Sequence, residues 1–93
     1  MIMHSPPHPG QILKELYLEP LNLSITETAH ALNITRQSLS EFINGRNGVS
    51  STMAWRLAKA FKTSPVLWLN LQTQYDLWNS KNNDFGDIIC LVA

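Results

Sequence analysis

Arg36 and Gln37 are adjacent residues whose side chains can each form a pair of hydrogen bonds with one base. The guanidinium of an arginine can donate two hydrogen bonds to guanine, and the amide of a glutamine can donate one and accept one on adenine. A good bidentate contact of this kind discriminates against a wrong base by about 1–3 kcal/mol. The hydroxyls of Thr35 and Ser38 could bind phosphates or contact a thymine methyl group. The four residues favour DNA contact, with phosphate contact as the main alternative for Arg36.

These side chains reach bases only if a helix presents them, and residues 25–44 predict that helix and its support. Ser24 and Glu27 match a capping box, which starts a helix at about residue 25 and carries it to about residue 32. Asn33 follows at a sharp turn, because asparagine tolerates a left-handed backbone. Thr35 is the natural N-cap of the next helix. The pattern is typical of a helix-turn-helix, whose second helix enters a DNA major groove.

The remaining residues of the motif predict its buried side. Ala29 is small where the two helices would cross, whereas Thr28 stands where an apolar residue is expected, although its methyl group can still pack. The apolar underside consists of Leu32, Ile34, Leu39 and Phe42. The structural alternative is an ordinary helical hairpin inside a bundle.

Glu41 faces the same way as Gln37 and would bring a negative charge toward DNA phosphates. It could accept a hydrogen bond from a cytosine amino group. Alternatively, it pairs locally with Gln37 or Arg46 and limits non-specific affinity. Asn44 and Arg46, just past the helix, are expected to contact phosphates.

The charge of the chain is unevenly distributed although its net charge is zero. Residues 36–62 carry five basic side chains and one acidic side chain, a local charge of +4, while the segments on either side each carry −2. A basic segment that begins with the second helix of the motif favours DNA binding. The alternative is scattered, solvated charge.

The rest of the chain predicts three further helices. The first begins at Pro9, carries Ile12, Leu13, Leu16 and Tyr17 at helical spacing, and ends at Glu19-Pro20. The fourth helix is capped by Ser50 or Ser51, and the fifth begins at Ser64-Pro65 and ends near Ser80. We therefore expect an all-α fold with one five-helix domain over residues 1–80. The apolar tail, residues 81–93, could be an added strand, a docked segment or a disordered end.

The fifth helix carries more large aromatic residues than the core of a small domain needs. Aromatic side chains are typical of the centres of protein interfaces. We predict a dimer or partner interface formed by Trp68, Leu71, Tyr75 and Trp78. The alternative is that they complete the core of the monomer. Trp55 lies off the apolar stripe of the fourth helix and could also face a partner.

Several classes of protein are disfavoured. His4 and His8 are four apart, but Pro6 and Pro7 prevent the helix that would align them on a metal, and the single cysteine, Cys90, has no spaced partner. No glycine-rich phosphate loop or nucleophile elbow occurs. We expect no enzyme, cofactor, metal or small-molecule substrate. Without an apolar run of about 18 residues or signal-peptide features, we expect a cytoplasmic protein with no membrane contact.

The chain also resembles the HigA-type antitoxins, also called VapI-like proteins, of the phage-repressor-like helix-turn-helix superfamily. The resemblance covers about residues 8–78. It rests on the segments His8-Pro9-Gly10-x-Ile12-Leu13, Tyr17-Leu18-Glu19-Pro20-Leu21, Thr35-Arg36-Gln37, Asn44-Gly45-Arg46, Met53-Ala54, Arg56-Leu57-Ala58-Lys59-Ala60-Phe61 and Ser64-Pro65-x-x-Trp68-Leu69-Asn70-Leu71-Gln72.

The resemblance implies a lambda-repressor-like DNA-binding domain that forms a homodimer. It also implies binding to double-stranded operator DNA, repression of the protein's own operon and neutralisation of a HigB-type toxin, a ribonuclease acting on messenger RNA. Carried over, the recognition positions are Arg36, Gln37, Ser38 and Glu41, although relatives often have a basic residue in place of Glu41. The tail after Trp78 departs from its relatives. The alternatives are a stand-alone regulator without a toxin and an interaction module that has lost DNA binding.

Overall fold

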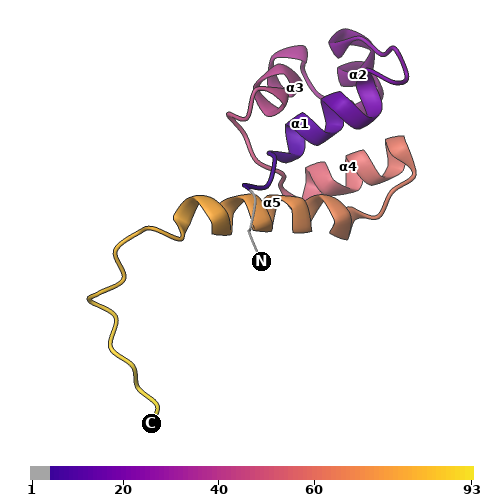
Figure 1. Ribbon diagram of the computed structural model, residues 1–93. Helices are drawn as coiled ribbons and strands as arrows, with labels where there is room; N and C mark the ends of the chain where they lie inside the picture. The colour runs from indigo at the N-terminus through magenta and orange to yellow at the C-terminus, as the bar shows by residue number, and fades with distance from the viewer. Residues whose placement is uncertain (1–4) are drawn as a thin grey trace.

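The computed structural model describes residues 5–93, which form helices and connecting segments without a strand. The helices are α1 (Pro9–Leu13), its continuation as the π-helix η1 (Lys14–Leu18), α2 (Ile25–Leu32), α3 (Arg36–Ile43), α4 (Ser51–Phe61) and α5 (Pro65–Ser80). Helices α1 to α4 surround a single core, and α5 packs against α4 and α1 on one side of it (Figure 1). The predicted all-α, five-helix fold is confirmed.

Side-chain caps define where α2, α3, α4 and α5 begin. The hydroxyls of Ser24, Thr35, Ser50 and Ser64 each accept a hydrogen bond from the backbone N–H three residues later, at 3.0–3.1 Å. The Ser24–Glu27 capping box is complete, and its hydrogen bonds from Ser24 lower the pKa of the Glu27 carboxyl. Caps of this kind satisfy N–H groups that have no partner inside the helix. The predicted helix starts are thereby confirmed, with Ser50 as the cap of α4.

The turn between α2 and α3 is made by Asn33. Its backbone is left-handed, with φ 57° and ψ 44°, and the N–H of Ile34 donates to the Ala29 carbonyl at 3.0 Å. Thr28 is 2% exposed, and its hydroxyl donates to the Ser24 carbonyl at 2.8 Å. A buried polar group costs little when it is hydrogen-bonded. Thr28 is therefore compatible with a position where an apolar side chain was expected.

The core corrects one of the interface predictions. Trp68 is completely buried within its own chain, and its indole N–H donates to the Thr63 hydroxyl at 2.7 Å. Its ring packs against Tyr17 with centroids 5.8 Å apart. A side chain without exposed surface cannot anchor a partner, so the assignment of Trp68 to an interface is wrong. Trp68 instead fastens α5 to the core.

The first helix differs from the predicted regular helix. Beyond Leu13 it widens into a π turn, in which the N–H of Glu19 donates to the Lys14 carbonyl at 2.9 Å. A π turn spans five residues instead of four, which brings Leu18 onto the same side as Leu13. Both leucines are buried, whereas Leu16 is 63% exposed. The predicted apolar stripe was therefore wrong at Leu16.

The tail, residues 81–93, extends away from the helical domain beyond the end of α5 (Figure 1). All its side chains are exposed, including the apolar residues Ile88, Ile89 and Leu91. It contains short turns, in one of which the N–H of Ile88 donates to the Phe85 carbonyl at 3.0 Å. Of the three alternatives for the tail, the structure contradicts an added strand and a segment docked on its own domain.

The start of α1 lies so close to the end of α3 that only glycine fits at position 10. A Cβ atom on Gly10 would lie 1.9 Å from the Phe42 carbonyl oxygen, which is backbone and cannot rotate away.

We expect Gly10→Ala to lower the free energy of unfolding by about 1–3 kcal/mol, because the overpacked helices must separate. Thermal and urea unfolding would measure this. The matched control is Gly86→Ala in the tail, where the added methyl group would meet only the Asp84 side chain at 3.0 Å. Equal stability of the two variants would show that the contact between α1 and α3 is not a constraint on the fold.

Candidate nucleic-acid interface

The outer face of α3 is open, whereas its inner face is completely packed. Leu39 is 0% and Phe42 is 2% exposed, and both belong to the core. Arg36, Gln37 and Ser38 are all exposed on the other side. A short helix held by its buried side chains presents its outer side chains in fixed positions, which is what recognition of a base edge requires.

Thr35 has a structural role at the start of this helix. Its hydroxyl oxygen accepts a hydrogen bond from the Ser38 N–H at 3.0 Å, while its side chain remains exposed. A hydroxyl that accepts one hydrogen bond can still donate its own proton. Thr35 can thus cap α3 and contact a phosphate at the same time.

Glu41 is engaged by two neighbouring side chains. The Gln37 amide donates to its Oε1 at 3.1 Å, and the Asn47 amide donates to its Oε2 at 2.9 Å. The predicted local pairing with Gln37 is confirmed. Arg46 contributes to this region through its backbone, because its N–H donates to the Glu41 carbonyl at 2.8 Å. Asn47, which sequence reasoning missed, takes the side-chain position that was considered for Arg46.

The basic side chains of residues 36–62 divide into two groups. Arg56 is half-buried, and its guanidinium donates to the carbonyls of Leu32 at 2.9 Å and Asn33 at 3.3 Å. It therefore stabilises the turn after α2 by pairing with carbonyls at the end of a helix. The exposed members of the set are Arg36, Arg46, Lys59 and Lys62. Asn44, at the end of α3, is also exposed.

His8 contacts residues of α1, α3 and α5. Its Nδ1 accepts a hydrogen bond from the Gly10 N–H at 2.9 Å and thereby caps α1. The imidazole packs edge-on against Phe42 and Tyr75, with centroids 5.6 and 4.9 Å away. Burial lowers the pKa of His8 below its ordinary value of 6.5, although a hydrogen bond with the Asn47 backbone and the charge of Asp76 oppose the shift.

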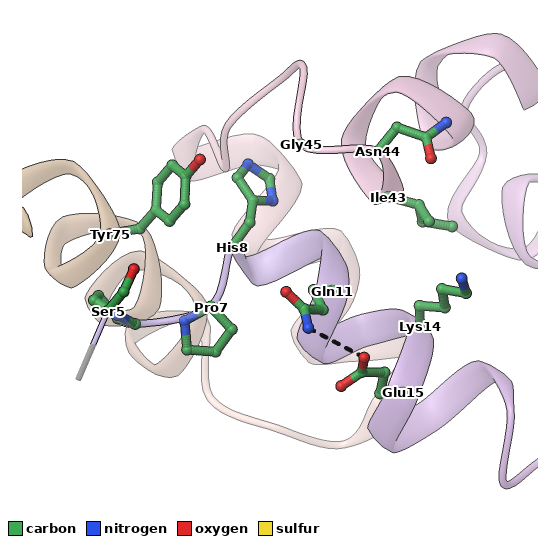
Figure 2. A pocket seen from close by; sticks show the side chains of 11 residues that line it. Ser5, Pro7, His8, Gln11, Lys14, Glu15, Ile43, Asn44, Gly45 and Tyr75 are labelled. Atoms are coloured by element: carbon green, nitrogen blue, oxygen red, sulfur yellow. Dashed lines mark hydrogen bonds between the residues drawn. The ribbon is translucent and has the colours of Figure 1, made fainter. Parts of the chain in front are cut away.

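His8 also lines a hollow of about 650 Å³ between the N-terminal segment, α1, the end of α3 and α5. Figure 2 shows Lys14 and Asn44 on the same side of this hollow, with Tyr75 across from them. Gln11 and Glu15 are hydrogen-bonded to each other at 3.1 Å on its wall. The hollow is lined mainly by polar groups and adjoins the end of α3.

A helix-turn-helix family model matches residues 13–68, which include α2, α3 and α4. The chain belongs to this family. It is 54% identical over 76 residues to virulence-associated protein A′ of Dichelobacter nodosus, a match that covers 81% of this chain and 65% of that protein. It is 49% identical over 78 residues to the uncharacterized HTH-type transcriptional regulator YbaQ of Escherichia coli K12, covering 84% and 69%.

A solved structure described as Pseudomonas aeruginosa antitoxin HigA with the higBA promoter superposes with a TM-score of 0.82. That comparison covers 94% of this chain and 99% of the HigA chain at 30% sequence identity. The resemblance to HigA-type antitoxins is confirmed by these relatives.

The helix-turn-helix domain leaves part of α5 open. Leu71, Tyr75 and Trp78 are half-buried, and the Lys81 ammonium lies 3.3 Å from the centroid of the Trp78 ring. The most exposed apolar side chains of this helix are instead Leu77 at 65% and Val66 at 57%. Leu77 and Val66 were missed because the aromatic residues dominated the sequence pattern. Trp55 on α4, at 67%, is exposed as expected.

The described part of the chain, residues 5–93, contains no group of three or more His, Cys, Asp or Glu side chains that could hold a metal ion. None of its helices combines the length and the apolar character needed to cross a bilayer. Cys90 is a free, exposed thiol in the tail. His4 lies outside the described residues.

The lowered pKa of His8 predicts a pH-dependent stability of this helix-turn-helix domain. Below pH 6.5 the unfolded chain binds a proton that the folded chain resists. The contribution of His8 is therefore complete above pH 6.5 and falls as the pH drops through the folded-state pKa. We expect His8→Asn, which keeps a capping side chain without a titratable ring, to flatten this dependence. Urea unfolding between about pH 7.5 and 5 would measure it. Equal slopes for the two proteins would contradict the assignment.

Proposed function

We propose that this chain is a DNA-binding antitoxin that binds its operator with α3, represses its own operon and neutralises a HigB-type ribonuclease toxin. The observation that carries the proposal is the exposure of Arg36 and Gln37 on α3 above a fully buried underside. The similar antitoxin HigA was solved with the higBA promoter, which supports DNA binding by this chain.

In the proposed complex the residues of α3 and its flanks have distinct roles. Arg36 and Gln37 contact base edges, because they lie in the first turn of the recognition helix. Thr35, Ser38, Asn44 and Arg46 bind the phosphate backbone and set the position of the helix in the groove.

The proposed protein acts as a homodimer. Two copies of α3 would dock in successive major grooves about 34 Å apart on a nearly palindromic operator. Leu71, Tyr75 and Trp78 lie along one face of α5 and give it an apolar surface on which a second copy could pack. Dimerisation then raises the effective concentration of the second recognition helix at its half-site.

The toxin part of the proposal rests on the resemblance to HigA-type antitoxins. The alternative, a stand-alone regulator, is supported by the relative described only as a transcriptional regulator. A neighbouring reading frame for a small basic protein would distinguish the two. If its product arrests growth, co-expression of this chain should restore growth and the two proteins should co-purify. Arrest that persists in the presence of this chain would favour the stand-alone regulator.

Titration of the protein against its own promoter tests the DNA-binding part. We expect tighter binding to the promoter than to a scrambled duplex. Gln37→Ala should reduce this preference by about 1–3 kcal/mol, because it removes a base contact. Arg46→Ala should weaken binding to both duplexes equally and reduce the dependence of the binding constant on salt, because it removes a phosphate contact.

Three results would contradict these assignments. An unchanged preference in Gln37→Ala would exclude base reading by Gln37. A loss confined to the promoter in Arg46→Ala would exclude a phosphate role. Absence of wild-type binding even at low salt would favour an interaction module that has lost DNA binding.

The dimer can be tested on α5 itself. Trp78→Glu should raise the dimer dissociation constant at least about tenfold, because it places a charge in an apolar contact. Sedimentation or light scattering across a concentration series would measure this. The matched control is Ile89→Glu, which adds the same charge to an exposed apolar residue of the tail and should leave the dimer intact. If Ile89→Glu dissociated the dimer and the variant on α5 did not, the interface would lie in the tail.

A further inference from the structure

Glu41 is the central acceptor of a small polar cluster on the recognition helix, formed by Gln37, Glu41 and Asn47. Each carboxylate oxygen accepts one hydrogen bond, from the Gln37 amide at 3.1 Å and from the Asn47 amide at 2.9 Å. Gln37 and Glu41 are one helical turn apart and therefore lie on the same face of α3. Glu41 is half-buried, whereas Gln37 is exposed.

The pairing determines which way the Gln37 amide points. A carboxylate only accepts hydrogen bonds, so the amide must turn its nitrogen toward Glu41. Its oxygen and its second N–H then have no partner in residues 5–93 and are available together. One acceptor beside one donor matches the N6–H₂ donor and N7 acceptor of adenine. Guanine presents two acceptors, O6 and N7, which the amide oxygen would oppose.

Asn47 holds Glu41 from outside the helix. Asn47 lies in the loop between α3 and α4. Two residues later in the same loop, the Val49 N–H donates a hydrogen bond to the side-chain amide oxygen of Gln72 on α5 at 2.9 Å. A similar pair, Gln11 on α1 and Glu15 on η1, is hydrogen-bonded at 3.1 Å, but Glu15 has no second side-chain donor among the described residues. Glu41 is thus anchored to the loop as well as to its own helix, and its carboxylate has a fixed direction.

We infer that Glu41 is a positioning residue that gives Gln37 its preference for adenine by fixing the direction of the Gln37 amide between α3 and the Asn47 loop. The inference rests on the proposed operator binding. It explains a carboxylate on a face that approaches phosphates: its charge opposes affinity for any duplex, but its hydrogen bonds make the adjacent reader selective.

The DNA-free protein gives the first test. In ¹⁵N NMR spectra, the side-chain amide of Gln37 should be ordered in the wild type and become mobile in Glu41→Ala. The exposed Gln74 on α5 serves as an internal reference and should not change. A Gln37 amide that is equally mobile in both proteins would overturn the inference without bearing on DNA binding.

The second test measures binding to promoter duplexes in which each adenine is replaced in turn by guanine. Gln37→Ala identifies the base pair that Gln37 reads. At that pair, Glu41→Ala should reduce the preference for adenine over guanine by a factor of about 3–10. Glu41→Gln should retain most of the preference. The oxygen of the new amide can accept from Gln37, and its nitrogen can donate to the side-chain carbonyl oxygen of Asn47. Both variants should bind scrambled DNA more tightly than the wild type.

Glu15→Ala is the matched control, since it removes a charge and a glutamine partner from η1 rather than α3, and it should leave the base preference unchanged. Circular dichroism and thermal unfolding would verify that each variant is folded. An adenine preference in Glu41→Ala equal to that of the wild type, with the preference lost in Gln37→Ala, would overturn the inference while leaving the proposed function intact. Equal binding of wild-type protein to promoter and scrambled DNA would instead refute the proposed function.

Discussion

The position of α3 depends on the close approach of its last turn to the start of α1. Gly10 leaves no side chain between the helices, and the backbone carbonyl of Phe42 occupies the space that a Cβ would need. The Phe42 ring can then enter the core and contact His8, which in turn contacts Tyr75 on α5. This steric constraint therefore fixes the position of α3 relative to α1 and α5. Because the core is closely packed, a displacement at this contact would shift the neighbouring helices.

The polar contacts around α3 hold the two ends of the reading surface. At one end, Arg56 binds the carbonyls that close the turn before α3. At the other, Asn47 binds Glu41, and the loop continues to Gln72 on α5. The Arg56 contacts join residues 24 and 23 apart in the sequence, whereas the Asn47–Glu41 contact joins residues six apart. The exposed side chains of α3 are thus presented by a supported helix, which is more precise than a loop for the recognition of a base edge.

The features predicted from the sequence are those decided by near neighbours in the chain. A cap such as Ser24 accepts a hydrogen bond from an N–H three residues away, and Asn33 is a residue type that tolerates the left-handed backbone it adopts. The features that were missed depend on contacts across the fold. The burial of Trp68 required the position of α5, and the role of His8 as a cap between two aromatic rings required α3 and α5. No local pattern specifies such contacts.

The charges of the site also bear on how a neutral chain could bind DNA. The local charge of +4, which already includes Glu41, overstates the attraction, because Arg56 is bound to backbone carbonyls. If Arg46 supplied the one cationic phosphate contact of each subunit, that contact would change the slope of log binding constant against log salt by only about 0.9. A monomer would then bind any duplex weakly. Selective binding would have to come from the direction of the Gln37 amide and from the second half-site, which depends on the apolar surface of α5. A weak general attraction would be an advantage in this arrangement, because it would leave most of the binding energy to contacts that distinguish one sequence from another.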